Sequence, residues 1–320
     1  MATMHFFLPL LPDEHYFSRI ARMAVLTPTK SMADFFRSWF SVNQSVNPLK
    51  DYQAVCNGLI THSKATMCED LLCRHTSAGF YSHFLDVERR RELLKGKAKC
   101  DRKKLFIPGL TKVQNANCWR ACPQCIEEDI ENFGTPYWHV SHQLPTAKVC
   151  TKHVFQTLIA GCNCCGWENI DLRKNPLPEA ICPKCNHDMQ ESSPTAIEAN
   201  VAIQSMGQEL YLNSCSLQCP MNERQMLRSV EHAFGDAIRS RNQEYWETKT
   251  QVEHEFWDWV LENQIGNYFN INTEAELHEL LRLESVINNP TKVTPMAHII
   301  CLAFFNQIGQ PNHDGLSLVS

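Results

Sequence analysis

Apolar residues recur every three or four positions in the first hundred residues and again after residue 195, which is the spacing of amphipathic α-helices. Asp13 is placed to cap a helix that continues through Met23. A second helix is expected over 31–40, where Phe35 and Phe36 fall on one apolar face. Further helices are predicted over 49–60, 65–73 and 86–95.

The acidic last part of the chain, 191–320, is also predicted to be helical. It includes a helix over 252–261 and another over 273–286, with Thr273 as the capping residue. Trp257 and Trp259 in the first of these helices suit anchors for a protein partner, because tryptophan is enriched at interface hot spots. The alternative is core packing at helical spacing, which we expect for at least one of the two.

Cysteine and histidine pairs set the middle of the chain apart. A Cys-x-x-Cys turn places two thiolates on one side of a tight loop, and a second pair completes a tetrahedron around one metal ion. Such closed sites are structural, because no coordination position is left for a reacting water. The chain carries two such sets in tandem and therefore predicts two structural Zn²⁺ ions: Cys122, Cys125, Cys150 and His153, then Cys162, Cys165, Cys182 and Cys185.

Two other uses of cysteine fit less well. Disulfide frameworks belong to short secreted domains, whereas this chain has 320 residues and its start does not resemble a signal peptide. A redox Cys-x-x-Cys needs a strand–helix context and would not recur beside a Cys-x-x-His pair. Within the second set, Cys164 competes with Cys165, and Gly166 favours Cys165 because glycine permits a left-handed turn. We expect the other cysteines to be buried small apolar residues: Cys56, Cys68, Cys73, Cys100, Cys118, Cys215, Cys219 and Cys301.

Together these patterns predict a mainly α fold with small zinc-stabilised β-hairpins. We expect three parts: a helical part over 1–105, a tandem zinc-ribbon or zinc-knuckle module over 106–190, and a helical domain over 191–320. The short helices and small-residue turns of the first part suit a helix-turn-helix arrangement, although compact helical bundles of other functions share the same pattern.

Charge is distributed unevenly between the two halves. Residues 1–190 contain 23 lysines and arginines against 18 acidic residues, a net charge of +5, whereas 191–320 contain 7 against 17, a net charge of −10. A basic cluster in the first half is expected to contact nucleic acid phosphates, and the bland alternative is a solvated helix face. The cluster contains Arg89, Arg90, Arg91, Lys95, Lys97, Lys99, Arg102, Lys103 and Lys104.

Catalytic and membrane signatures are missing from the sequence. There is no Walker A motif, and His254-Glu255 and His278-Glu279 lack the second histidine of a zinc protease. The zinc deaminase pattern is not met either. No run approaches the roughly 18 apolar residues of a membrane span. We therefore expect a non-enzymatic, cytoplasmic protein without a membrane partner.

A family resemblance covers most of the chain. The central motif reads Trp119-Arg-Ala-Cys122-Pro-Gln-Cys125, then Tyr137-Trp138, then His142-Gln-Leu-Pro145, then Cys150-Thr-Lys-His153. This segment is similar to the TniQ/TnsD family, and so are the N-terminal stretch Leu11-Pro12-Asp13-Glu14 and the stretch that begins Thr294-Pro295.

The resemblance implies a non-catalytic target selector of Tn7-like transposons. Such proteins bind double-stranded DNA, or dock on a guide-RNA effector complex, and recruit an AAA+ ATPase regulator that brings in the transposase. The two ligand sets above would hold the two zinc ions. Longer family members extend well beyond 320 residues, so we expect either a short member or part of a longer protein.

Within this picture Arg120 and Lys152, beside zinc ligands, are the expected phosphate contacts. Tyr137, Trp138 and His142 are expected to pack under the first zinc rather than to contact bases. Two other function classes stay open: a stand-alone zinc-containing transcriptional regulator on promoter DNA, and an adaptor that binds only protein.

Overall fold

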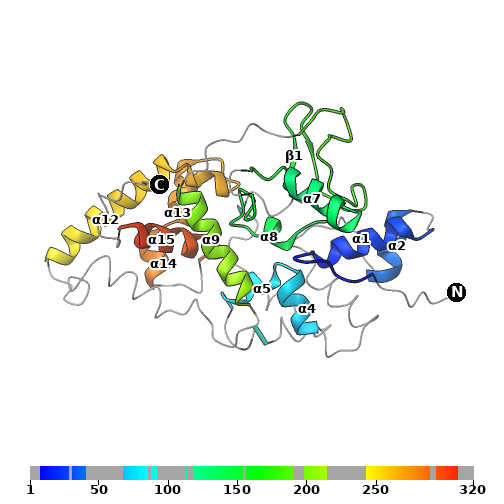
Figure 1. Ribbon diagram of the computed structural model, residues 1–320. Helices are drawn as coiled ribbons and strands as arrows, with labels where there is room; N and C mark the ends of the chain where they lie inside the picture. Colours follow the sequence, from blue (N-terminus) through cyan, green and yellow to red (C-terminus); the bar gives the residue numbers. More distant parts are fainter. Residues whose placement is uncertain are drawn as a thin grey trace, which may run out of the picture. The chain divides into compact units, whose positions relative to one another are not determined.

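In the computed structural model the chain forms two compact units, and Figure 1 labels their helices and strands. The first unit contains residues 1–106 and 114–217, and the second contains 107–113 and 218–320. This division differs from the three expected parts, because the N-terminal helices and the cysteine-rich region belong to one unit. The structure describes residues 8–28, 31–40, 68–85, 88, 90–91, 112–113, 118–153, 156–189, 198–214, 243–288 and 293–308.

The described residues of the first unit are mainly helical and include one small antiparallel hairpin, as the sequence predicted. Strands β1 (Gly161–Cys162) and β2 (Trp167–Glu168) pair Cys162 with Trp167. Its helices are α1 (Tyr16–Leu26), α2 (Met32–Phe40), α4 (Cys68–His75), α5 (Ala78–Ser82), α7 (Pro123–Phe133), α8 (Val140–Gln143) and α9 (Glu198–Leu212).

The expected helices of the first part are placed as follows. The prediction over 31–40 corresponds to α2, and the prediction over 65–73 corresponds to α4, which begins and ends slightly later. Of the prediction over 86–95, only Glu88, Arg90 and Arg91 are described, and all three are helical. The prediction over 49–60 lies outside the described residues.

Helix α1 is capped by His15, so the prediction of Asp13 as its cap was wrong. The His15 Nδ1 atom accepts a hydrogen bond from the Phe17 amide at 3.2 Å. Asp13 instead adopts a left-handed backbone conformation, with φ of 56°. Its carboxylate accepts hydrogen bonds from the Ser141 amide and hydroxyl, 128 residues later in the chain.

One hydrophobic core joins the N-terminal helices to the cysteine-rich region. Phe17 from α1, Phe36 from α2 and Leu72 from α4 are fully buried with Trp119 and Trp138. The Trp138 indole also donates to the Pro176 carbonyl at 2.9 Å. Because both regions bury the same side chains, neither has a complete core of its own.

A short backbone pairing links the two cysteine sets. The Ala121 amide donates to the Ile159 carbonyl at 3.0 Å, and the Ile159 amide donates back at 2.8 Å. Ala121 directly precedes Cys122, and Ile159 lies in the small core around Cys162 and Cys182. The two sets are therefore connected by an antiparallel bridge as well as by the chain.

The second unit packs around α15 (Pro295–Ile308), whose described side chains are buried over most of its length. The expected helix over 252–261 lies inside α12 (Gln243–Glu262). The other elements among the described residues of this unit are η4 (Ile265–Tyr268), α13 (Glu274–Leu280) and α14 (Leu283–Asn288).

Thr273 caps α13 as predicted, because its side chain accepts from the Glu276 amide at 3.3 Å. The single helix expected over 273–286 was wrong, since α13 and α14 are separate. Leu281 and Leu283 are both buried. Residues two apart in one continuous helix point about 200° apart, so a break is needed to bury both against one core.

No helix among the described residues is both long enough and apolar enough to cross a membrane.

Candidate metal centres

The first cysteine–histidine cluster is built at the start of α7. Cys122 is the residue before the helix, Pro123 occupies its first turn, and Cys125 follows within that turn. Proline suits this place because its missing amide hydrogen would be unpaired there in any case. Cys150 and His153 approach from a later turn and complete the four donors.

The donor atoms of this cluster are spaced as the corners of a tetrahedron. Cys125 Sγ lies 3.5 Å from Cys150 Sγ, and His153 Nδ1 lies 3.4 Å, 3.5 Å and 3.6 Å from the sulfurs of Cys122, Cys125 and Cys150. A tetrahedron with metal–sulfur bonds of about 2.3 Å has edges of about 3.8 Å. The four side chains could therefore hold one metal ion.

Neighbouring side chains hydrogen-bond these donors. Glu128 Oε1 lies 3.1 Å from His153 Nε2, which leaves Nδ1 facing the three sulfurs. His142 Nε2 lies 3.5 Å from the Cys150 sulfur. Hydrogen bonds from the Cys122 and Cys125 thiols lower the pKa of Cys150. Carboxylate–histidine pairs of this kind fix the ring orientation in metal sites.

The second cluster is formed by two similar turns. The Gly166 amide donates to the Cys162 carbonyl at 2.8 Å, and the Asn186 amide donates to the Cys182 carbonyl at 2.9 Å. Gly166 and Asn186 both adopt positive φ, 67° and 58°. Each turn is thus a Cys-x-x-Cys loop closed by a left-handed residue, the conformation that glycine and asparagine favour.

The structure selects Cys165 over Cys164 as the fourth donor. Cys165 Sγ lies 3.7 Å from Cys182 Sγ, and Cys162 Sγ lies 3.6 Å from Cys185 Sγ. Cys164 is exposed and lies outside the set. The left-handed Gly166 was the sequence signal for this choice, and the four thiols Cys162, Cys165, Cys182 and Cys185 could hold a second metal ion.

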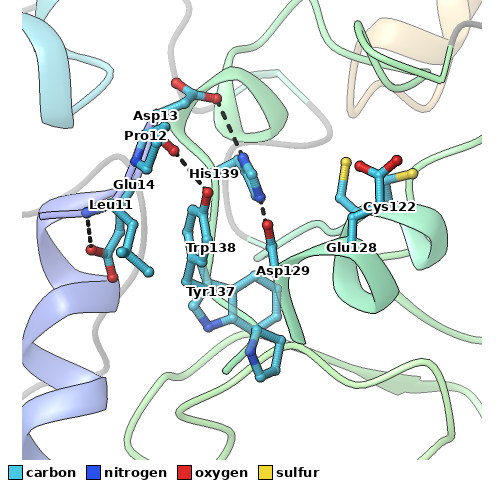
Figure 2. Close-up of polar contacts among 12 residues, drawn as sticks. Leu11, Pro12, Asp13, Glu14, Cys122, Glu128, Asp129, Tyr137, Trp138 and His139 are labelled. Atoms are coloured by element: carbon cyan, nitrogen blue, oxygen red, sulfur yellow. Dashed lines mark hydrogen bonds and ion pairs between the residues drawn. The ribbon is translucent and has the colours of Figure 1, made fainter. Parts of the chain in front are cut away.

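A charged network that the sequence reasoning missed ties the N-terminal stretch to α7 (Figure 2). His139 Nε2 lies 2.9 Å from the Asp129 carboxylate, and His139 Nδ1 lies 3.7 Å from the Asp13 carboxylate. Burial alone would lower the pKa of His139, but the hydrogen bonds to Asp129 and Asp13 raise it to about 9. His139 is therefore a half-buried side chain between two carboxylates that favour its protonated form.

Other contacts of the N-terminal stretch are equally specific. The Tyr137 hydroxyl donates to the Pro12 carbonyl at 3.0 Å, and Glu14 Oε2 accepts from the Leu11 amide at 3.0 Å (Figure 2). Glu14 also pairs with Arg22 at 2.7 Å in a buried salt bridge. The Leu-Pro-Asp-Glu segment was thus a usable signal, because each of its members is fixed against α1 or the cysteine-rich region.

Arg120 is buried, which corrects its prediction as a phosphate contact. Its side chain belongs to a residue that is only 2% exposed, and its guanidinium donates to the carbonyls of Leu144, at 2.8 Å, and Ala147. The backbone of Arg120 also pairs with the Gln143 amide group in both directions. Arg120 therefore supports the segment that leads to Cys150.

Tyr137, Trp138 and His142 are all buried, and His142 lies beside the first cluster, with Nε2 3.5 Å from the Cys150 sulfur. Lys152 is exposed, with 63% of its side chain accessible, and it pairs with Glu128. Arg91 is exposed, and Arg90 donates to the Ser214 carbonyl at 3.1 Å. The other members of the predicted basic cluster lie outside the described residues: Arg89, Lys95, Lys97, Lys99, Arg102, Lys103 and Lys104.

The two tryptophans of α12 differ. Trp259 is 8% exposed, and its indole donates to Gln307 at 2.7 Å, so its expected role as a protein anchor was wrong. Trp257 is half-buried and lies against the His278 ring.

Among the remaining cysteines, Cys73 and Cys301 are buried as predicted. Cys118 is half-buried, and burial raises the pKa of its thiol to about 11. Cys68 lies in α4, and the other four cysteines expected to be buried lie outside the described residues: Cys56, Cys100, Cys215 and Cys219.

Comparison with known proteins gives two findings. The TniQ family model matches residues 5–156, a segment that contains the whole first cluster and the Asp13–His139–Asp129 network. Over 88 residues the chain is 27% identical to the transposon Tn7 transposition protein TnsD of Escherichia coli, an alignment that covers 27% of this chain and only 17% of that protein. Residues 5–156 of this chain are thus similar to the TniQ family.

Proposed function

We propose that this protein is a non-catalytic target-site selector for Tn7-like DNA transposition. In this role it binds target DNA, or a guide-RNA effector complex on that DNA, and recruits an AAA+ ATPase regulator that brings in the transposase. The observation that carries the proposal is the TniQ segment over 5–156 built around the first cysteine–histidine cluster, together with the similarity to TnsD.

The two clusters are proposed to hold two structural Zn²⁺ ions. Three sulfurs and one imidazole, or four sulfurs, are the donor sets that zinc prefers in closed sites. Bound zinc would join turns that are far apart in sequence, here Cys122 and Cys150, and so contribute directly to folding.

DNA contact is proposed for exposed basic side chains of the first unit. Lys152 and Arg91 are exposed. The other basic residues of the 89–104 cluster are also proposed to contact DNA, on sequence alone. Clustered cations bind a phosphate backbone with release of counterions. Lys152 is already paired with Glu128, so phosphate would have to compete with that carboxylate.

The acidic part of the chain is proposed to meet protein rather than DNA. Residues 191–320 carry a net charge of −10, which repels phosphate. The proposed partner is the ATPase regulator, and the half-buried Trp257 is the aromatic residue proposed to contact it. These partners place the proposed site of action in the cytoplasm, on the nucleoid.

The test is co-sedimentation of the purified protein with the AAA+ ATPase encoded beside its gene, on DNA with and without ATP. The expected result is retention that requires ATP and is lost in Cys150→Ser, which removes one donor of the first cluster. Cys164→Ser is the matched control, because that cysteine is exposed and outside both clusters.

Two outcomes would redirect the proposal. DNA binding without ATPase retention would favour a stand-alone zinc-containing transcriptional regulator. ATPase retention without DNA affinity at physiological salt would favour an adaptor that binds only protein.

A further inference from the structure

A cavity of about 480 Å³ lies in the second unit between α12 and the pair α13 and α14. One wall is the Trp257 indole, and the buried Leu283 closes the cavity at the side of α14. Glu253 and Glu279 supply two carboxylates at opposite walls, one from α12 and one from α13. Aromatic, apolar and acidic groups thus converge on one hollow.

The tryptophan in this cavity is held in place but not covered. The Trp257 and His278 ring centroids are 3.5 Å apart, with the ring planes inclined by 35°. Trp257 is half-buried, whereas its neighbour Trp259 is buried and hydrogen-bonded. A large aromatic side chain that remains partly exposed in a cavity is a typical recognition element.

The charge around the cavity is strongly negative. Residues 243–288 contain ten aspartates and glutamates against two cations, Lys249 and Arg282. Lys249 is already shared, 3.8 Å from Glu253 and 3.7 Å from Glu284. Among the described side chains, no cation pairs with Glu279. The field over this surface therefore favours a positively charged ligand and opposes phosphate.

We propose that this cavity receives an arginine side chain of a partner protein. A guanidinium can lie flat on an indole face while its N–H groups reach carboxylates at the rim. Trp257 would supply the aromatic surface, and Glu279 and Glu253 the acceptors. The volume accommodates one long side chain and part of its backbone, which fits an exposed arginine on a partner better than a small free cation.

The inference does not depend on which protein is the partner, so it can fail without affecting the proposed transposition role. The test uses the full chain labelled with ¹⁵N in its seven tryptophan indoles. The probe is a capped Gly-Ser-Arg-Ser-Gly peptide, and the matched probe carries citrulline, which keeps the shape of arginine and removes its charge. Trp257→Phe identifies the signal of interest in the spectrum.

We expect a saturable shift of the Trp257 indole signal with the arginine peptide, at least tenfold weaker binding of the citrulline peptide, and no shift of Trp259. Glu279→Gln, a change at an exposed position, should weaken binding several-fold. Glu262→Gln, an exposed acid on α12 outside the cavity, should leave it unchanged.

The Arg282→Ala variant tests whether the cavity prefers a positively charged ligand. Removing this cation from the cavity wall should strengthen binding of the arginine peptide. Weaker binding in Arg282→Ala, equal binding of the citrulline peptide, or a shift that Glu279→Gln leaves intact would each overturn the proposal.

Discussion

The two candidate metal centres differ in how far their cysteines are buried. In the first, the three cysteines are buried within the same region as the large core of the first unit, and histidine and carboxylate side chains hydrogen-bond the donors. In the second, Cys185 is exposed, and the local core consists of Ile159, Cys162, Cys182 and Met189. The first cluster lies beside a large hydrophobic core, whereas the cysteines of the second cluster make up much of their own small core.

This difference suggests what each ion would do. Around the first cluster, the core of aromatic residues would still exist without metal, but the Cys150 turn would lose its attachment to α7. Around the second cluster, two turns closed by left-handed residues and a hairpin with two residues in each strand offer little apolar area to bury. Small regions of this kind depend on metal for folding itself.

The largest expected effect comes from breaking each cluster in turn. Cys150→Ser should lower the free energy of unfolding of the first unit by more than about 4 kcal/mol, because a buried metal site is lost. Cys182→Ser should instead unfold only the residues near 161–189. Amide hydrogen exchange measures both, with zinc content falling from two to one in each variant. Equal, global loss of protection in the two variants would contradict the comparison.

The pH dependence of stability should also separate the two regions. The pKa of His139 is raised from 6.5 to about 9, so the folded state binds a proton that the unfolded state has released. Its stabilisation is complete below pH 6.5 and is lost as the pH rises through 9, with an upper limit of roughly 3 kcal/mol. Denaturant unfolding from pH 6 to 10 tests this.

Two controls accompany the pH series. Asp129→Asn removes the closer carboxylate and should flatten the dependence. Exchange protection near Gly161 and Trp167, in the second cluster's hairpin, should not follow the His139 titration. An unchanged profile in Asp129→Asn would assign the pH dependence to another group.

Arg120→Ala should destabilise the framework of the first cluster by roughly 2–4 kcal/mol, because the buried carbonyls of Leu144 and Ala147 lose a charged donor. The salt dependence of DNA binding should stay as it is. Lys184→Ala is the counterpart at the second cluster, where an exposed ammonium lies 3.5 Å from the Cys165 carbonyl, and it should change stability little. Thermal unfolding compares the two.

The smallest effect is expected from Glu128→Gln. Loss of the carboxylate that orients His153 should lower the zinc affinity of the first cluster by about 10–100-fold, while the zinc affinity of the second cluster stays the same. Competition with a chromophoric chelator measures the two sites in one titration. Glu127→Gln, at the neighbouring exposed position of α7, is the matched control. Equal weakening of both sites would mean that Glu128 does not act through His153.

The parts of this molecule that sequence reasoning predicted correctly depend on local spacing. The ligand pairs, the left-handed Gly166 and the Thr273 cap each involve residues within a few positions of one another. The joining of Cys125 and Cys150 in one ligand set, across 25 residues, was predicted only because a zinc site needs two ligand pairs.

The missed features all require contacts between distant segments. No sequence pattern near Asp13 predicts that its carboxylate contacts Ser141 and His139. From sequence Arg120 is expected at the surface, and only its long-range hydrogen bonds to backbone carbonyls explain its burial. The division between α13 and α14 likewise depends on the burial of both Leu281 and Leu283. Long-range packing overrode local propensity at each of these places.

The Ala121–Ile159 pair has a mechanical consequence. Its two backbone hydrogen bonds, 3.0 Å and 2.8 Å, connect the residue before Cys122 to the chain that enters the second cluster. A displacement of Ile159 would therefore be transmitted directly to the backbone beside Cys122. The spacing of the two clusters therefore depends on this backbone bridge as well as on the chain between them.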